Sequence, residues 1–193
     1  MGKEKKVKDI MSGIEEYEKI DQDARLCDAL MILRKNFEKI ENQHPKDLHK
    51  TLIVIDASGK IVGKLSVYDL IRGLVPEEAK KPEHWRPFYN VLTSRAQSVE
   101  NEVKTMQERF QWLHTSFFDL VKRETQKHVK DVMSEPHPLL DEEDPLNKAV
   151  YVMFKEHIRQ PMVVKDGEIV GMVSIMDLFP ELLDIAGDRC FLE

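Results

Sequence analysis

Apolar residues along this chain gather in short runs, and the same order of runs occurs twice. The segment Thr51–Gly63 reads TLIVIDASGKIVG, and the segment Pro161–Gly171 reads PMVVKDGEIVG. Each segment holds two apolar runs separated by a polar stretch with one glycine. Runs of this length, bounded by turn residues, predict two strands joined by a tight turn. We expect positive φ angles at the turn glycines, Gly59 and Gly167.

A helical pattern precedes each predicted strand pair, and another follows it. The first pattern has the same spacing in both copies: Leu26, Leu30 and Leu33, then Leu146, Val150 and Met153. Steps of four and three place these residues on one face of a helix. The strand pair then runs into a second helix, in the sequences IVGKLSVYDL and IVGMVSIMDL. A short lead, VKDIMS or VKDVMS, opens each copy.

The two copies predict one α/β module. They occupy residues 1–75 and 129–185, and each is too small to bury both faces of its own core. Two βαββα repeats packed face to face, related by a pseudo-twofold axis, solve this problem. The first repeat carries an insert at 36–50, and residues 186–193 form a C-terminal tail.

Residues 76–128 separate the repeats and belong to neither. Prolines at positions 76, 82 and 87 predict loop or short turns at the start. Apolar residues then recur at alternating steps of four and three: Leu92, Ala96, Val99, Val103, Met106, Phe110, Leu113, Phe117 and Leu120. This seam predicts a long inserted helix. It favours a homodimer formed through the helix Leu92–Leu120; packing of the helix along the protein's own repeats is the alternative.

Composition and charge narrow the function classes. Hydrophobic residues make up 41% of the 193 residues and charged residues 33%, which fits a folded protein with a well-solvated surface. The net charge of −6 argues against a general nucleic-acid binder, which needs surplus Lys and Arg. No apolar run reaches the ~18 residues of a membrane span. With two cysteines, Cys27 and Cys190, and no secretory signal, we expect a cytoplasmic protein without disulfides.

The VKDxMS leads, the order of elements and the closing IVGxxSxxDL segments together resemble the CBS domain, named after cystathionine β-synthase. Two copies in tandem look like a Bateman module. The resemblance covers about residues 1–75 and 129–185. It implies a regulatory module whose clefts bind AMP, ADP, ATP or S-adenosylmethionine.

Each repeat carries Ser-x-x-Asp where its second helix begins: Ser66 with Asp69, and Ser174 with Asp177. One interpretation is a capping box, in which each side chain satisfies a backbone N–H of the first turn. The same geometry suits a nucleotide, because a helix N-terminus attracts phosphate and a carboxylate accepts from ribose hydroxyls. The resemblance implies that these four residues line nucleotide clefts, with the aspartates holding ribose.

The second repeat follows the family pattern more closely than the first. Its segment HIRQPMVV places Arg159 just before the Pro161 strand, and the resemblance implies that a basic residue there meets phosphate. A plain surface arginine is the alternative interpretation. The first repeat has Lys-Thr-Leu at the corresponding place. We therefore expect a ligand to prefer the cleft that contains Asp177.

The sequence carries no recognisable catalytic motif. It lacks a P-loop, a nucleophile elbow and a zinc-protease motif, and its seven histidines show no metal-ligand spacing. We expect no catalytic residue, no metal and no cofactor. The sequence thus predicts a regulatory protein that binds an adenosine-containing ligand between its repeats and signals by conformational change. The alternative is a ligand-free structural or interaction module that dimerises through the inserted helix.

Overall fold

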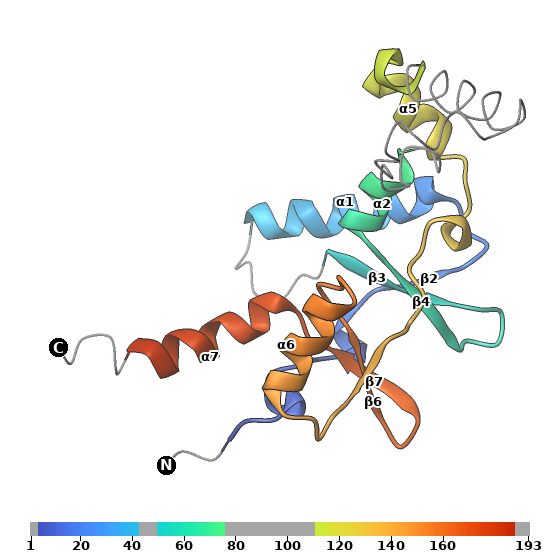
Figure 1. Ribbon diagram of the computed structural model, residues 1–193. Coiled ribbons are helices and arrows are strands. Elements are labelled where there is room, and N and C mark those ends of the chain that lie inside the picture. The colour runs from blue at the N-terminus through green and yellow to red at the C-terminus, as the bar shows by residue number, and fades with distance from the viewer. Residues whose placement is uncertain (1–3, 43–49, 76–110, 188–193) are drawn as a thin grey trace, which may run out of the picture.

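The computed structural model describes residues 4–42, 50–75 and 111–187, and it contains two similar α/β units (Figure 1). The first unit consists of β2 (Lys19–Asp21), α1 (Leu26–Asn42), β3 (Thr51–Ile55), β4 (Ile61–Ser66) and α2 (Val67–Gly73). The second consists of β5 (Leu139–Asp141), α6 (Leu146–Lys155), β6 (Met162–Lys165), β7 (Glu168–Met172) and α7 (Ile175–Gly187). The predicted βαββα order is confirmed in both units.

The strands of the two units pair in the same way. In the first unit β2 runs parallel to β3, and β3 runs antiparallel to β4. In the second unit β5, β6 and β7 repeat this arrangement. Gly59 and Gly167 have φ angles of 83° and 84°, as expected for the tight turns that join the antiparallel strands.

The two leads are exchanged between the units. Strand β1 (Ser12–Gly13), in the first lead, pairs with β7 of the second unit, and Ser134 in the second lead bridges to Lys64 of β4. Val7 is buried in the core of the second unit, and Val129 in the core of the first. Three 3-10 helices belong to these segments: η1 (Val7–Asp9), η2 (Ile14–Glu16) and η4 (Val129–Asp131).

Buried residues form one cluster in each unit and a third that both sheets share. Leu52 and Val54 of β3 belong to the first unit's own cluster. Ile53, which lies between them, points to the opposite face, as the period of two in a strand requires. It packs there in the shared cluster with Met162 and Met172 of the second unit. The shared cluster holds the two units together.

The buried stripes of α1 and α6 agree with the predicted ones at Leu26 and Met153, which are buried, and differ at the middle position. Ala29 and Ala149 are fully buried, whereas Leu30 and Val150 are 37% and 40% exposed. A three-element unit presents a narrow surface to its helix, so small side chains allow close packing and the larger neighbours turn outwards. The predicted periodicity was right, but the face was assigned wrongly at these positions.

The predicted insert begins as a continuation of helix α1. This helix has 17 residues, whereas its counterpart α6 has 10. Residues 36–42 therefore extend α1, and residues 43–49 of the insert lie outside the described residues. Lys50, at the end of the insert, lies next to β3.

The predicted helix Leu92–Leu120 lies mostly outside the described residues, and its last part is not continuous. Helical structure ends after residue 114, and Ser116 becomes the N-cap of a new helix, α5 (Phe117–Glu124). The Ser116 hydroxyl accepts from the Asp119 backbone N–H, which favours a helix start at this point. Leu113 and Phe117 of the seam are 70% and 67% exposed, and Leu120 is buried.

Candidate functional site

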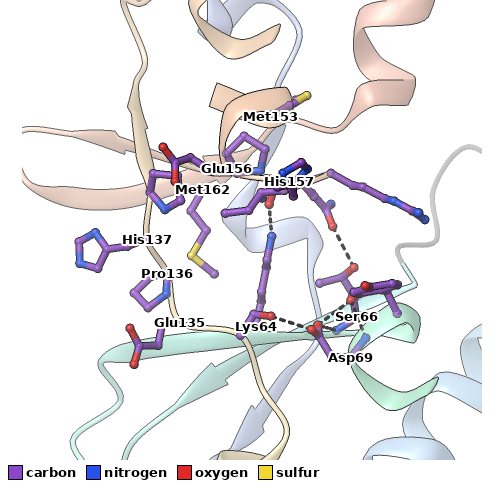
Figure 2. Close-up of a pocket in the computed structure, with 18 of the residues that line it drawn as sticks. Lys64, Ser66, Asp69, Glu135, Pro136, His137, Met153, Glu156, His157 and Met162 are labelled. Atoms are coloured by element: carbon purple, nitrogen blue, oxygen red, sulfur yellow. Dashed lines mark hydrogen bonds between the residues drawn. The ribbon is translucent and has the colours of Figure 1, made fainter. Parts of the chain in front are cut away.

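Ser66 and Asp69 form a closed capping box at the start of α2 (Figure 2). The Ser66 backbone N–H donates to Asp69 Oδ2 at 2.8 Å, and the Asp69 N–H donates to Ser66 Oγ at 3.2 Å. The Ser66 hydroxyl also donates to Asp69 Oδ2, at 2.6 Å. The local sequence dictates this arrangement, because serine and aspartate three residues apart satisfy the free N–H groups of a helix start.

A third residue, Ser134, completes the surroundings of Asp69. Its hydroxyl donates to Asp69 Oδ1 at 2.6 Å, so both carboxylate oxygens accept hydrogen bonds. Asp69 is only 4% exposed. Ser134 comes from the exchanged lead, and sequence reasoning did not select it. The serine that ends both VKDxMS leads was the available signal.

A cavity of about 950 Å³ opens beside this capping box and is walled by both units. Figure 2 shows Ser66 and Asp69 on one side, Met153, His157 and Met162 across from them, and the lead with Glu135, Pro136 and His137 along a third side. The volume lies within the range of pockets that hold small organic ligands.

Arg159 of the second unit lines this same cavity. Its guanidinium lies over the ring of Tyr68 in α2, 5.3 Å from the ring centre, which is the geometry of a cation–π contact. The structure therefore brings together three of the predicted ligand residues, Ser66, Asp69 and Arg159. The sequence had grouped Arg159 with the Ser-x-x-Asp of its own repeat, because nothing local reveals that the units face each other crosswise.

Ser174 and Asp177 form the corresponding pair at the start of α7 and are not among the residues of this cavity. The Ser174 N–H donates to Asp177 Oδ2 at 2.6 Å, and the Asp177 N–H donates to Ser174 Oγ at 3.3 Å. This pair is therefore also a capping box. Its expected partner Arg159 lies in the other cleft.

Tyr17 occupies the neighbourhood of Asp177. The tyrosine is 4% exposed and packs in the shared cluster with Met172. The pKa of Tyr17 is raised to about 12, mainly by burial; the charge of Asp177 also raises it, and hydrogen bonds with Ser12 and Gln160 lower it. Ser12 and Asp177 are the counterparts of Ser134 and Asp69. A buried tyrosine thus interacts with Asp177, whereas Asp69 lines the cavity.

Lys64 is the second residue that sequence reasoning missed. It lies in β4, two residues before Ser66, and is 8% exposed. Its ammonium donates to the Gln160 backbone carbonyl of the second unit. Burial lowers the pKa of Lys64 to about 8, and the charge of Asp69 acts in the opposite direction. The signal was present in the repeat: GKLS in the first copy corresponds to GMVS in the second.

Gln160, which lines the cavity, links the two units. Its side-chain oxygen accepts from the Thr51 hydroxyl at 3.0 Å, and its Nε2 donates to the Tyr17 hydroxyl at 3.3 Å. Together with the bond from Lys64 to its carbonyl, these contacts tie β3, β4 and the first lead to the second unit. A ligand that moves Lys64 therefore acts on the packing between the units.

No group of three or more His, Cys, Asp or Glu side chains within residues 4–42, 50–75 and 111–187 is arranged to hold a metal ion. Among the helices of the same ranges, none is long and apolar enough to cross a membrane.

Comparisons with known proteins agree with this architecture. The family model of the CBS domain matches residues 129–184. An uncharacterised protein of Methanocaldococcus jannaschii is 27% identical over 179 residues, which are 92% of this chain and 90% of that protein.

Solved structures extend the likeness to both units. The structure of CBSX2 in complex with AMP is 20% identical and covers 93% of this chain and 97% of its own, with a TM-score of 0.53. The CBS-pair protein CBSX2 from Arabidopsis thaliana is 20% identical and covers 96% and 99%, with a TM-score of 0.56. Residues 129–184 are therefore a CBS domain, and the chain as a whole has the fold of a tandem CBS pair, or Bateman module.

Proposed function

We propose that this chain is a regulatory, non-catalytic protein of the cytoplasm that binds an adenosine-containing ligand in the cavity beside Asp69. The observation that carries the proposal is the meeting of Asp69 from one unit with Arg159 from the other around one cavity. A similar fold, CBSX2, has been solved with AMP, which supports this class of ligand.

The sequence favoured the Asp177 cleft as the binding site. We propose the Asp69 cleft instead. Asp69 lies on the cavity wall and Arg159 is exposed at the same cavity. One site therefore offers a carboxylate that can bind the ribose and a cation that can bind the phosphate. Ser174 and Asp177 do not line this cavity, and the buried Tyr17 lies close enough to Asp177 to interact with its charge. Ser174 and Asp177 then serve as helix caps.

A ligand in this cavity would contact both units at once, which gives it a way to change how they pack. Ser66 and Asp69 belong to the first unit, Arg159 and Gln160 to the second, and Ser134 to an exchanged lead. Ribose hydroxyls that donate to the Asp69 carboxylate compete with the hydroxyl donors of Ser66 and Ser134. A ligand with different affinities for two arrangements of the units shifts their populations, which is the thermodynamic requirement for a sensor.

Ligand-dependent melting tests the proposed function. We expect at least one of AMP, ADP, ATP and S-adenosylmethionine to raise the melting temperature at millimolar concentration. A ligand at 100 times its Kd adds about 2.7 kcal/mol to the free energy of unfolding. Arg159→Ala is expected to weaken binding of that ligand about tenfold or more, because a charge-assisted hydrogen bond to phosphate is lost.

Arg34→Ala is the matched control for this experiment. Arg34 is an exposed arginine of α1 that pairs with Glu38, away from the cavity. Its substitution removes the same charge and should leave the melting shift unchanged. If none of the four compounds shifts the melting temperature of the unmodified protein, the sensor function is refuted.

A second candidate function is an interaction module that forms a homodimer. It is favoured by Leu113 and Phe117, two large apolar side chains of the predicted seam that are 70% and 67% exposed. Both closed capping boxes also explain the Ser-x-x-Asp pairs without a ligand. Large apolar side chains exposed close together are typical of a protein–protein contact.

We expect the double substitution Leu113→Glu, Phe117→Glu to convert a dimer into a monomer, because it places charges in an apolar contact. Sedimentation equilibrium measures the mass directly. Lys122→Glu is the control: Lys122 is exposed on α5, the helix that begins at Phe117, and its substitution changes the net charge by the same amount as the double variant. If the unmodified protein, the double variant and the control all have the same mass, Leu113 and Phe117 do not form a dimer contact.

A further inference from the structure

Lys64 stands at a position where the other unit has an apolar core residue. Each unit has a glycine in the second strand of its hairpin, Gly63 or Gly171, and the next residue is Lys64 in β4 and Met172 in β7. Met172 is fully buried in the cluster that both sheets share. Lys64 occupies the equivalent inward position with 8% exposure, on the wall of the Asp69 cavity. The unit thus carries a cation where its fold requires none.

The protein satisfies this ammonium only in part. An ammonium group has three donors, and in the described structure that of Lys64 has one hydrogen-bond partner, the Gln160 carbonyl. The nearby carboxylate of Asp69 already accepts three hydrogen bonds from Ser66 and Ser134. Figure 2 shows the Lys64 side chain extending from β4 into the space between the two units. A buried charge with free donors beside a cavity indicates a ligand contact.

The other charged residues of the cavity also favour a negatively charged ligand. Its basic residues are Lys50, Lys64, Arg72 and Arg159; its acidic residues are Asp69, Glu135 and Glu156; its histidines are His137 and His157. Four cations therefore face three carboxylates, in a chain whose net charge is −6. Lys50, Arg72 and Arg159 are exposed, so solvent and salt screen them. Lys64 is buried, and its charge acts at a lower effective dielectric constant.

We propose that Lys64 selects the ligand by charge: its buried ammonium favours a phosphate-bearing adenosine ligand and disfavours a sulfonium-bearing one. This inference rests on the proposed function and adds the ligand class to it. A protonated Lys64 attracts the anionic phosphate groups of AMP or ADP, and it repels the positive sulfur of S-adenosylmethionine. A methionine at this position, as in the other unit, carries no charge and does not distinguish the two kinds of ligand in this way.

The test compares the affinities of ADP and S-adenosylmethionine for the unmodified protein and for Lys64→Met, by calorimetry at pH 7 and constant salt. We expect Lys64→Met to weaken ADP binding about tenfold or more, since a charge-assisted contact is lost. S-adenosylmethionine binding should not weaken, so the ratio of the two Kd values should also change about tenfold or more. Lys60→Met removes the same charge from the exposed β3–β4 turn and should leave the ratio unchanged.

Melting temperature separates a ligand contact from a purely structural role. Because the pKa of Lys64 lies below the ordinary lysine value in the folded protein, its charge at pH 7 opposes folding. Lys64→Met should therefore melt no lower than the unmodified protein. If the variant melts lower and keeps the original Kd ratio, Lys64 is structural and the inference is overturned.

The remaining outcomes are also decisive. If the unmodified protein binds either ligand and Lys64→Met leaves the Kd ratio unchanged, this inference fails while the proposed function stands. If the unmodified protein binds neither ligand and also neither AMP nor ATP, both the inference and the proposed function fail.

Discussion

We expect Gly63→Ala to lower the free energy of unfolding by about 3 kcal/mol, because the added methyl group has no room. A Cβ atom built on Gly63 lies 2.6 Å from the Ser134 carbonyl oxygen and 2.9 Å from Met133 Sδ. The backbone of β4 cannot retreat without breaking the Lys64 N–H to Ser134 carbonyl bond and its reciprocal, at 3.0 and 2.9 Å. Overpacking and two lost backbone hydrogen bonds together give this magnitude.

Urea unfolding of Gly63→Ala measures the loss, and Gly187→Ala is the control. Gly187 ends helix α7, and a Cβ there meets nothing within 4 Å. Its substitution should leave stability unchanged or raise it slightly, because alanine favours helix. The pseudo-twofold axis adds a second check: a Cβ on Gly171 lies 2.5 Å from the Ser12 carbonyl oxygen, so Gly171→Ala should match Gly63→Ala. A Gly63→Ala protein as stable as the unmodified one would mean that the leads are not exchanged as described.

Asp69→Ala is expected to destabilise the protein by about 3 kcal/mol, and Asp177→Ala by about 1 kcal/mol. Asp69 accepts hydrogen bonds from the Ser66 N–H, the Ser66 hydroxyl and the Ser134 hydroxyl. Its removal leaves these partly buried donors unsatisfied, at about 1–3 kcal/mol each before water enters. Asp177 accepts from the Ser174 N–H and is more exposed, so its loss resembles that of an ordinary helix cap.

The two aspartate variants are matched by the internal repeat, so their difference isolates the contribution of the exchanged lead. Chemical denaturation at pH 7 gives both values under the same conditions. The double variant Asp69→Ala, Ser134→Ala should lose little more than Asp69→Ala alone, because the serine has then lost its partner already. Equal losses for Asp69→Ala and Asp177→Ala would contradict the importance assigned to the Ser134 contact.

The local sequence pattern determined much of the secondary structure of this protein. The two hairpins, their glycine turns and the capping boxes depend on residues within a few positions of one another, and the sequence repeat gave the number of units and their order. The break at Ser116 shows the limit of periodicity: the seam continues through it, but a serine with an aspartate three residues later favours a new helix start.

Tertiary structure decided the composition of the site. The leads could complete either unit by their pattern alone, because both units offer equivalent edges, and only the assembled protein shows that they are exchanged. That exchange brings Ser134 to Asp69, and the crosswise packing brings Arg159 to the same cavity. Tyr17 and Lys64 break the symmetry, one beside Asp177 and the other beside Asp69. The sequence by itself determined two equivalent helix starts; contacts between residues far apart in the chain gave the Asp69 start its serine from the exchanged lead and its arginine from the other unit.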